Sequence, residues 1–169
     1  LAGICGTDLH MWQNGLQAET VLGHENVGVI VAMGEAVTSD HVGKPLQEGD
    51  RIVFAPGTPN GGYGFLDPEK APQFHGGFSD YIALYLEGTC YLKTGLSPEV
   101  AVLTEPFTIG VHAAMRADIR IGDTVVVQGS GAIGLVTVAC AKISGAGKIV
   151  VVGGPEDRLS LASMMGADV

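Results

Sequence analysis

Short apolar runs separated by turn residues fill the first half of the chain. Residues 27–33 form a β-branched run beside glycines, residues 50–54 form a second such run, and residues 79–84 alternate polar and apolar side chains for part of their length. Several short strands at this spacing predict a small β-barrel-like domain. Residues 56–72, which are rich in Gly and Pro, predict a long surface loop.

The pattern changes at Ser97-Pro98-Glu99, a helix-start signal in which Ser can cap, Pro fits the first turn and Glu complements the helix dipole. The apolar stretch that follows is interrupted at Pro106 and resumes to about Arg116. A buried strand, a helix, a second strand and a second helix are then predicted over residues 124–128, 131–144, 148–152 and 156–165. This order is typical of a doubly wound α/β domain with a parallel sheet.

We therefore expect two domains, residues 1–100 and residues 101–169. Two parallel strands cannot bury their own edges or cover both faces of a sheet. The second domain is accordingly expected to be incomplete, and the chain to be an internal piece of a longer protein.

Composition narrows the classes of partner. Nine Lys and Arg residues against 18 Asp and Glu residues give a net charge of −9, which disfavours nucleic acid and anionic membrane surfaces. The three cysteines, Cys5, Cys90 and Cys140, are odd in number and widely spaced, so we expect no disulfide framework and a reducing, cytoplasmic compartment. The uncharged stretch 124–141 is broken by glycines, which favours strand, turn and helix over a membrane span.

The sequence G-x-G-x-x-G follows the first predicted parallel strand and precedes its helix. Gly129 allows the tight turn, Gly131 lets a pyrophosphate approach the backbone, and Gly134 lets helix pack on strand, with Ala132 and Ile133 between them. The helix N-terminus then favours phosphate through its dipole. We interpret these residues as a dinucleotide-binding turn; the alternative is a glycine turn with no ligand.

An acidic residue that binds the ribose is expected about twenty positions further on. Gly153, Gly154 and Pro155 occupy that place here, which weakens the preference for NAD. The acidic pair at 156–157 would repel the 2′-phosphate of NADP, and only Arg158 offers a compensating charge. The sequence favours NAD, with NADP as the alternative and with Gly153 and Arg158 as candidate cofactor contacts.

Cys5 and His24 are candidate ligands of a catalytic zinc ion, which needs three protein ligands and one open position. Glu25 or Glu105 would supply the third ligand. The alternative interpretation is structural, with Cys5 as a small buried hydrophobic residue and His24 as a hydrogen-bonded core histidine.

Several motifs in order give the chain a family resemblance. They are Gly3 to His10, Gly23-His24-Glu25 with Gly28 and Gly34, Gly49 to Ile52, Gly76 to Tyr81, Glu105-Pro106 leading to Gly110 to Ala113, and Gly129 to Gly134. Together they resemble the zinc-dependent medium-chain alcohol dehydrogenases. The resemblance implies a β-barrel-like GroES-like catalytic domain followed by an α/β Rossmann domain, and the Glu-Pro pair is similar to the sorbitol and polyol dehydrogenase branch.

Carried over by position, Cys5 and His24 match the catalytic zinc ligands. Glu25 matches the carboxylate beside the metal, and Glu105 a carboxylate that ligates zinc or holds its water. Asp8 would orient the ring of His24.

The resemblance also implies a proton path. Thr7 would pass a proton from the substrate, and His10 would form the outer end of that relay. The structural alternatives are a turn or capping carboxylate for Asp8 and a surface histidine for His10.

The activity implied is hydride transfer between a small secondary alcohol or polyol, or the matching ketone, and NAD(P), by a homo-oligomer. One catalytic zinc is expected and no structural zinc, because residues 56–72 lack the four cysteines that relatives with a second metal carry. Two alternatives stay open: a zinc-free NADPH-dependent enone or quinone reductase of the same superfamily, and a non-catalytic binding protein that kept the fold.

Overall fold

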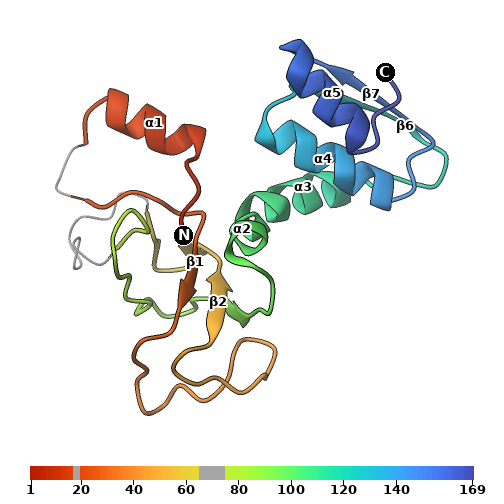
Figure 1. Cartoon of the computed structure of the whole chain (residues 1–169). Helices are drawn as coiled ribbons and strands as arrows, with labels where there is room; N and C mark the ends of the chain where they lie inside the picture. The colour runs from red at the N-terminus through yellow and green to blue at the C-terminus, as the bar shows by residue number, and fades with distance from the viewer. Residues whose placement is uncertain (17–19, 65–74) are drawn as a thin grey trace. The chain divides into compact units, whose positions relative to one another are not determined.

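The protein is described by a computed structural model that covers residues 1–16, 20–64 and 75–169 (Figure 1). The chain divides into two compact units, Leu1–Glu105 and Pro106–Val169. The three cysteines are free. Within the described ranges, no helix combines the length and the apolar character that crossing a membrane requires. Residues 65–72 of the expected surface loop lie outside the described residues.

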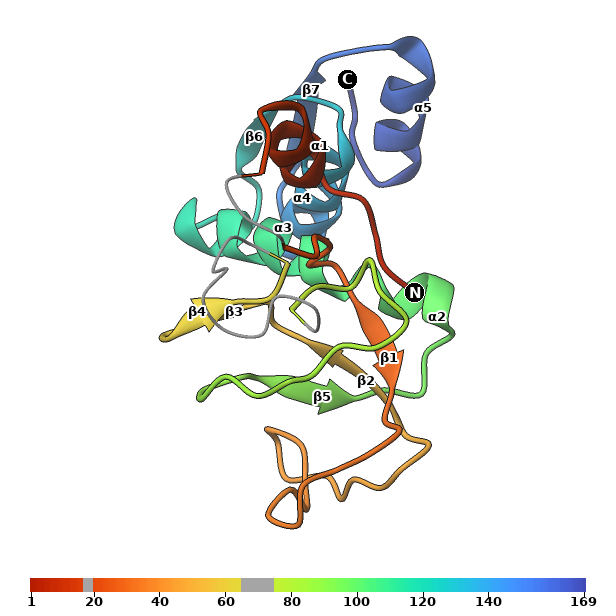
Figure 2. The ribbon, with the colours of Figure 1, turned by 90° about the vertical axis from the view of Figure 1, so that its left-hand side faces the viewer.

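The first unit is built on a three-stranded antiparallel sheet in the order β1-β2-β5 (Figure 2), with β1 at Val27–Val29, β2 at Arg51–Phe54 and β5 at Tyr91–Lys93. Val53 pairs with Val27 on one side and with Leu92 on the other. Val27 and Val53 are buried together with Ala101, which gives this unit its own apolar core. A two-stranded ribbon of β3, Gly57–Thr58, and β4, Gly61–Gly62, completes the described strands.

Two strands differ from expectation. The run 27–33 is a strand only over its first three residues, and residues 79–84 form no strand. The Ser79 hydroxyl donates to the carbonyls of Gly76 at 2.7 Å and Tyr81 at 2.6 Å. Such local side-chain bonds offer the backbone an alternative to a sheet ladder, so the alternating pattern was misleading here.

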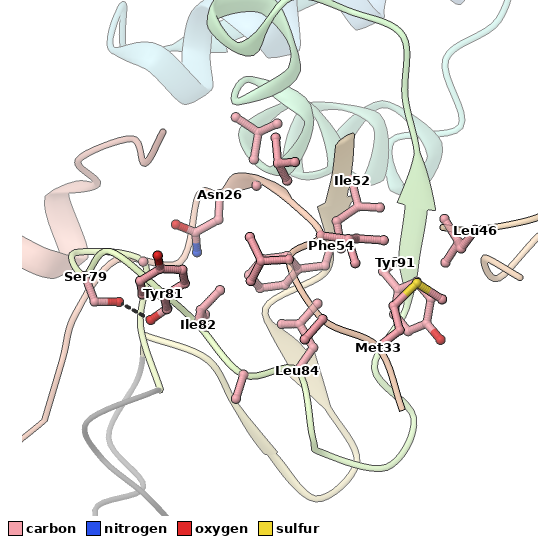
Figure 3. A pocket seen from close by; sticks show the side chains of 18 of the residues that line it. Asn26, Met33, Leu46, Ile52, Phe54, Ser79, Tyr81, Ile82, Leu84 and Tyr91 are labelled. Atoms are coloured by element: carbon pink, nitrogen blue, oxygen red, sulfur yellow. Dashed lines mark hydrogen bonds between the residues drawn. The ribbon is translucent and has the colours of Figure 1, made fainter. Parts of the chain in front are cut away.

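A hollow of about 570 Å³ lies in the first unit (Figure 3). Most of its labelled side chains are apolar or aromatic, and Phe54, Ile82 and Leu84 are among them. Cys5, His24 and Glu25 are not among the described residues that line it, so the hollow is distinct from the candidate metal ligands.

Three helices belong wholly or partly to the first unit: α1, Gly6–Gln13; α2, Pro98–Ala101; and α3, Thr104–Arg116. Ser97 is the N-cap of α2, with Pro98 in its first turn, as predicted. Pro106 lies in the first turn of α3 and does not interrupt it. A first-turn N–H has no partner within its helix, so a proline is tolerated there.

The second unit is a parallel strand–helix–strand–helix arrangement. Strands β6, Thr124–Gln128, and β7, Lys148–Val152, pair in register from Thr124↔Lys148 to Gln128↔Val152, and helix α4, Ala132–Ile143, connects them. Helix α5, Glu156–Met164, follows. Val138 on α4 and Ile149 on β7 are fully buried in a core shared with Val127 and Ala162. These elements confirm the sequence prediction to within one residue at each end.

Candidate functional site

Two stretches of the first unit bring together a thiol, an imidazole and a carboxylate. Cys5 directly precedes α1, and His24 and Glu25 precede β1. The backbone N–H of Gly3 donates to the carbonyl of Glu25 at 2.8 Å, which holds the N-terminal residues beside this segment. One ligand atom from each of Cys5, His24 and Glu25 lies within 4.8 Å of the other two.

Asp8 connects the two stretches. Its side chain, 3% exposed, accepts the backbone N–H of Cys5 at 2.8 Å and that of Gly23 at 3.2 Å. The same carboxylate lies 3.3 Å from Nδ1 of His24, which is itself buried. Because Nδ1 faces Asp8, the ring offers Nε2 to a ligand.

The donor set fits a zinc ion. Thiolate, imidazole and carboxylate are the ligands that zinc takes in proteins, and three of them leave a fourth tetrahedral position open. The buried carboxylate behind His24 is the outer partner that metal-ligating histidines usually have. Cys5, His24 and Glu25 could therefore hold the metal.

Glu105 lies in the first turn of α3 and is half-buried. Burial raises the pKa of its carboxyl above the usual value, the charge of Glu25 raises it further, and the charge of His24 opposes both. Glu105 thus shares the electrostatic environment of the candidate ligands, although it is not one of the three clustered residues.

Thr7 and His10, the residues expected to move protons, are both exposed on α1. The ring of His10 forms a hydrogen bond with the side-chain amide of Asn14 at 3.1–3.2 Å. Because Thr7 and His10 are three residues apart, their side chains lie on one face of the helix. The ligand cluster itself includes neither of them.

Sequence reasoning missed Asn26. Its buried side-chain amide donates to the carbonyl of Gly23 at 3.0 Å. The backbone N–H of Gly77 donates to the same carbonyl at 2.8 Å, and a Cβ at Gly77 would overlap the Asn26 amide. The Gly76-Gly77 pair was the available signal, because it allows two backbones to approach this closely.

Gly23 shows why the segment that carries the candidate metal ligands needs glycine. Its φ of +96° is unfavourable for residues with a Cβ, and a Cβ there would lie 2.6 Å from the ring of Phe78. Gly23, the residue before His24, is therefore held both by the hydrogen bonds to its carbonyl and by the ring of Phe78 packed beside it.

The second unit carries the glycine turn. Gly129 has φ +103°, and its N–H donates to the carbonyl of Val152 at 2.8 Å, which ties the turn to the end of β7. Gly131 is the N-cap of α4, and a Cβ at Gly129 or Gly131 would meet no atom within 4 Å. A Cβ at Gly134 would overlap the carbonyl oxygen of Gly129.

This turn fits a dinucleotide. The space above Gly129 and Gly131 is open, and the first residues of α4, Ala132 and Ile133, are exposed. Free N–H groups at a helix N-terminus are suited to a pyrophosphate. At the end of β7, Gly153 is exposed, as is Arg158 in the first turn of α5.

Residues 1–94 match the sequence profile of the alcohol dehydrogenase GroES-like domain. Sorbitol dehydrogenase of Bacillus subtilis is 37% identical over 182 residues, covering 98% of this chain and 50% of the relative. The chain thus spans about half the length of the curated relatives it matches.

Two solved structures extend the comparison. An alcohol dehydrogenase from Thermotoga maritima has a TM-score of 0.84 at 29% identity, covering 99% of this chain and 52% of its own. A protein described as a zinc-binding dehydrogenase from Sinorhizobium meliloti, bound to NADP, has a TM-score of 0.80 at 26% identity, covering 99% and 51%. These likenesses confirm the expected fold, a GroES-like domain with the beginning of a Rossmann domain.

Proposed function

The chain belongs to the zinc-dependent medium-chain alcohol dehydrogenases, and from this we propose that the whole protein transfers a hydride between a secondary alcohol or polyol and a nicotinamide cofactor. The observation that carries the proposal is the convergence of Cys5, His24 and Glu25 within 4.8 Å. A zinc-free reductase of the same fold has no need for a thiol, an imidazole and a carboxylate at one point.

Each candidate site residue of the first unit has a proposed role in binding zinc or substrate. Cys5, His24 and Glu25 hold zinc, and Asp8 aims the ring of His24 by facing its Nδ1. When bound, zinc acts as a Lewis acid toward the substrate oxygen. Glu105 supplies a second carboxyl group, either as an alternative ligand or as a hydrogen-bonding partner of a water molecule.

Proton transfer is assigned to α1. The Thr7 hydroxyl takes the proton from the substrate hydroxyl and passes it on, and His10 delivers it to solvent. The exposure of both residues on one helix face supports this direction of travel.

The cofactor is proposed to be NAD, with NADP as the alternative. Glu156 and Asp157 in the first turn of α5 would repel a 2′-phosphate, whereas Arg158 would attract it. The likeness to an NADP-bound dehydrogenase keeps the alternative open.

A polyol is the favoured substrate class, supported by the sorbitol dehydrogenase relative and by Glu105 in its Glu-Pro setting. We further propose that the whole protein is a homo-oligomer. We also propose that it is cytoplasmic, because three free cysteines suit a reducing compartment.

The test combines metal analysis of the whole protein with turnover of secondary alcohols and polyols, using both cofactors. We expect one zinc per chain and NADH formation with a polyol. Cys5→Ser should lower turnover to below about a hundredth of the native rate, because it removes a ligand. Cys90→Ser is the matched control, since Cys90 lies outside the ligand cluster.

Two outcomes would reject the proposal. Zinc-free protein that reduces an enone or quinone with NADPH would identify the reductase alternative. Cofactor binding without alcohol-dependent NADH formation would identify a non-catalytic protein.

A further inference from the structure

The second residue of the glycine turn, Ser130, is 2% exposed and uses its hydroxyl twice. Oγ donates to the carbonyl of Gly154 at 2.9 Å and accepts the backbone N–H of Gly154 at 3.0 Å. One buried side chain thus satisfies both backbone groups of a residue 24 positions away, just beyond the end of the neighbouring strand.

This bridge fills the space beside Gly153. A Cβ at Gly153 would lie 2.7 Å from Oγ of Ser130 and 2.8 Å from its backbone nitrogen. A Cβ at Gly154, by contrast, would meet nothing within 4 Å. Any side chain at 153 therefore conflicts with Ser130, whereas one at 154 has room.

Gly153 occupies the position at which selectivity between NAD and NADP is set in dinucleotide-binding folds. Gln128 pairs with Val152 in the parallel ladder, so Gly153 directly follows the end of β7 beside the glycine turn. In dinucleotide-binding units, the residue that binds the ribose hydroxyls with a carboxylate stands at the end of this second strand.

We propose that Ser130 is a specificity-determining residue: by bridging to Gly154 and filling the space beside Gly153, it excludes a ribose-binding carboxylate and leaves the site with weak selectivity between NAD and NADP. The inference rests on the proposed function, because it assumes a nicotinamide dinucleotide at this turn. Ser130 acts by position, through the backbone that surrounds the ribose.

The charged groups nearest in sequence cannot restore strong selectivity. Glu156, Asp157 and Arg158 are all exposed, and the two negative charges are opposed by one positive charge. Exposed charges are screened by water and salt. We therefore expect the dissociation constants of NAD and NADP to differ by no more than about tenfold in the native protein, with NAD bound more tightly.

The test is a double-mutant cycle in the whole protein, made of native protein, Ser130→Gly, Gly153→Asp and the combined S130G/G153D. Calorimetric binding of NAD, NADP, ADP-ribose and 2′,5′-ADP measures the adenosine end without any catalytic step. Thermal unfolding of the same four proteins reports the steric conflict.

We expect Gly153→Asp alone to lower the melting temperature by several degrees, about the effect of overpacking, and to weaken both cofactors. In S130G/G153D the hydroxyl and the bridge to Gly154 are gone, but the backbone nitrogen of residue 130, 2.8 Å from the new Cβ, remains. Without the bridge the backbones at residues 130 and 153 can move apart, so we expect stability to recover in part. The new carboxylate then repels the 2′-phosphate, and the preference for NAD over NADP should rise at least about tenfold above native.

Two matched controls bracket the result. Gly154→Asp has room for its side chain and should leave the melting temperature within about a degree of native. Ser160→Ala removes an exposed hydroxyl that donates to the carbonyl of Glu156 in its own helix, and should change neither stability nor binding.

The proposal is overturned if Gly153→Asp is as stable as Gly154→Asp, or if it gains NAD selectivity with Ser130 in place. It is also overturned if native protein already prefers one cofactor by a hundredfold or more. Failure of native protein to bind either dinucleotide or ADP-ribose would instead reject the proposed function, so the two failures are distinguishable.

Discussion

Single residues hold the candidate metal ligands in position, and Asp8 is the clearest case. Its buried carboxylate meets two backbone N–H groups and the imidazole of His24. An ionised carboxylate is costly to bury unless such partners compensate it. The Asp8 side chain therefore both stabilises the local fold and fixes the orientation of the His24 ring.

Replacing this carboxylate by an amide should affect both properties. In Asp8→Asn one oxygen becomes a donor that faces N–H groups, so we expect a loss of about 1–3 kcal/mol in the free energy of unfolding. Zinc affinity should fall by about 10–100-fold, as for other outer partners of metal-ligating histidines. Chemical denaturation and competition with a chelator measure the two effects.

Asp118→Asn is the control, because Asp118 is an exposed carboxylate paired with exposed Arg120. Exposed pairs contribute little, so this variant should match native protein. An Asp8→Asn protein with native zinc affinity would show that Asp8 does not position His24.

At the scale of elements, the turn between β6 and α4 contains glycines with two different duties. Gly134 lacks room for a Cβ because α4 packs against the carbonyl of Gly129, whereas Gly131 faces open space. Gly134 is therefore needed for packing of the fold, and Gly131 for access of the ligand to the backbone.

Alanine substitutions should separate these duties. Gly134→Ala should lower the free energy of unfolding by about 1–3 kcal/mol through overpacking. Gly131→Ala should cost less than about 1 kcal/mol, yet weaken NAD by about tenfold or more, because the methyl group keeps the pyrophosphate from the backbone. Equal effects of the two substitutions on stability would contradict this assignment.

Asp40 joins a loop to strand β5. Burial pushes the pKa of its carboxyl upward, but hydrogen bonds from the backbone N–H groups of Lys93, Lys44 and Val42 outweigh it, and the pKa lies below its usual 3.8. A lowered folded-state pKa adds stability that is present above the unfolded value and is lost as pH falls through the folded value.

Asp40→Asn should therefore destabilise the protein most near neutral pH. The difference in free energy of unfolding from native protein should shrink as the pH falls below about 3.8. Denaturation curves between pH 7 and pH 3 measure this. A difference that stays constant over that range would show that the carboxylate charge contributes nothing.

Sequence reasoning succeeded where local signals were sufficient. Strands β6 and β7 were predicted at their observed bounds, because each is a continuous apolar run and the glycine turn marks the end of β6. The expected burial of the first strand was wrong, since only Val127 of β6 is buried among the described residues. It failed at residues 79–84, where the Ser79 hydroxyl bonds to nearby carbonyls. The coupling of Ser130 to Gly154 was also invisible, because it depends on strand pairing across 24 residues.

The candidate metal site was predicted as a set of residue types and by resemblance. Spacing alone left Glu25 and Glu105 open as the third ligand, and the structure clusters Glu25 with Cys5 and His24. That convergence depends on Gly3 pairing with Glu25 and on Asp8 reaching Gly23, neither of which leaves a local pattern in the sequence.

At the scale of the whole molecule, the two units have separate cores. Val27, Val53 and Ala101 belong to the first, and the cluster around Val138 and Ile149 belongs to the second. The candidate metal ligands all lie in the first unit and the glycine turn in the second.

Ligand removal should therefore act on one unit at a time. Chelation of zinc should raise amide hydrogen exchange around residues 3–10 and 22–26 and leave β6 and β7 unchanged, because local opening follows the contacts that are lost. Removal of NAD should raise exchange around residues 129–134 instead. Mass spectrometry of the whole protein measures both, and a uniform rise after chelation would contradict the separation.

The bridge that Asp8 makes between the start of α1 and Gly23 has a consequence for how the protein is produced. The thiol and the imidazole come within reach of one ion only after this bridge forms, so capture of zinc and folding of the first unit are thermodynamically linked. Cultures starved of zinc should yield less intact protein and more proteolysed chain, and supplementing the growth medium with zinc should restore the yield.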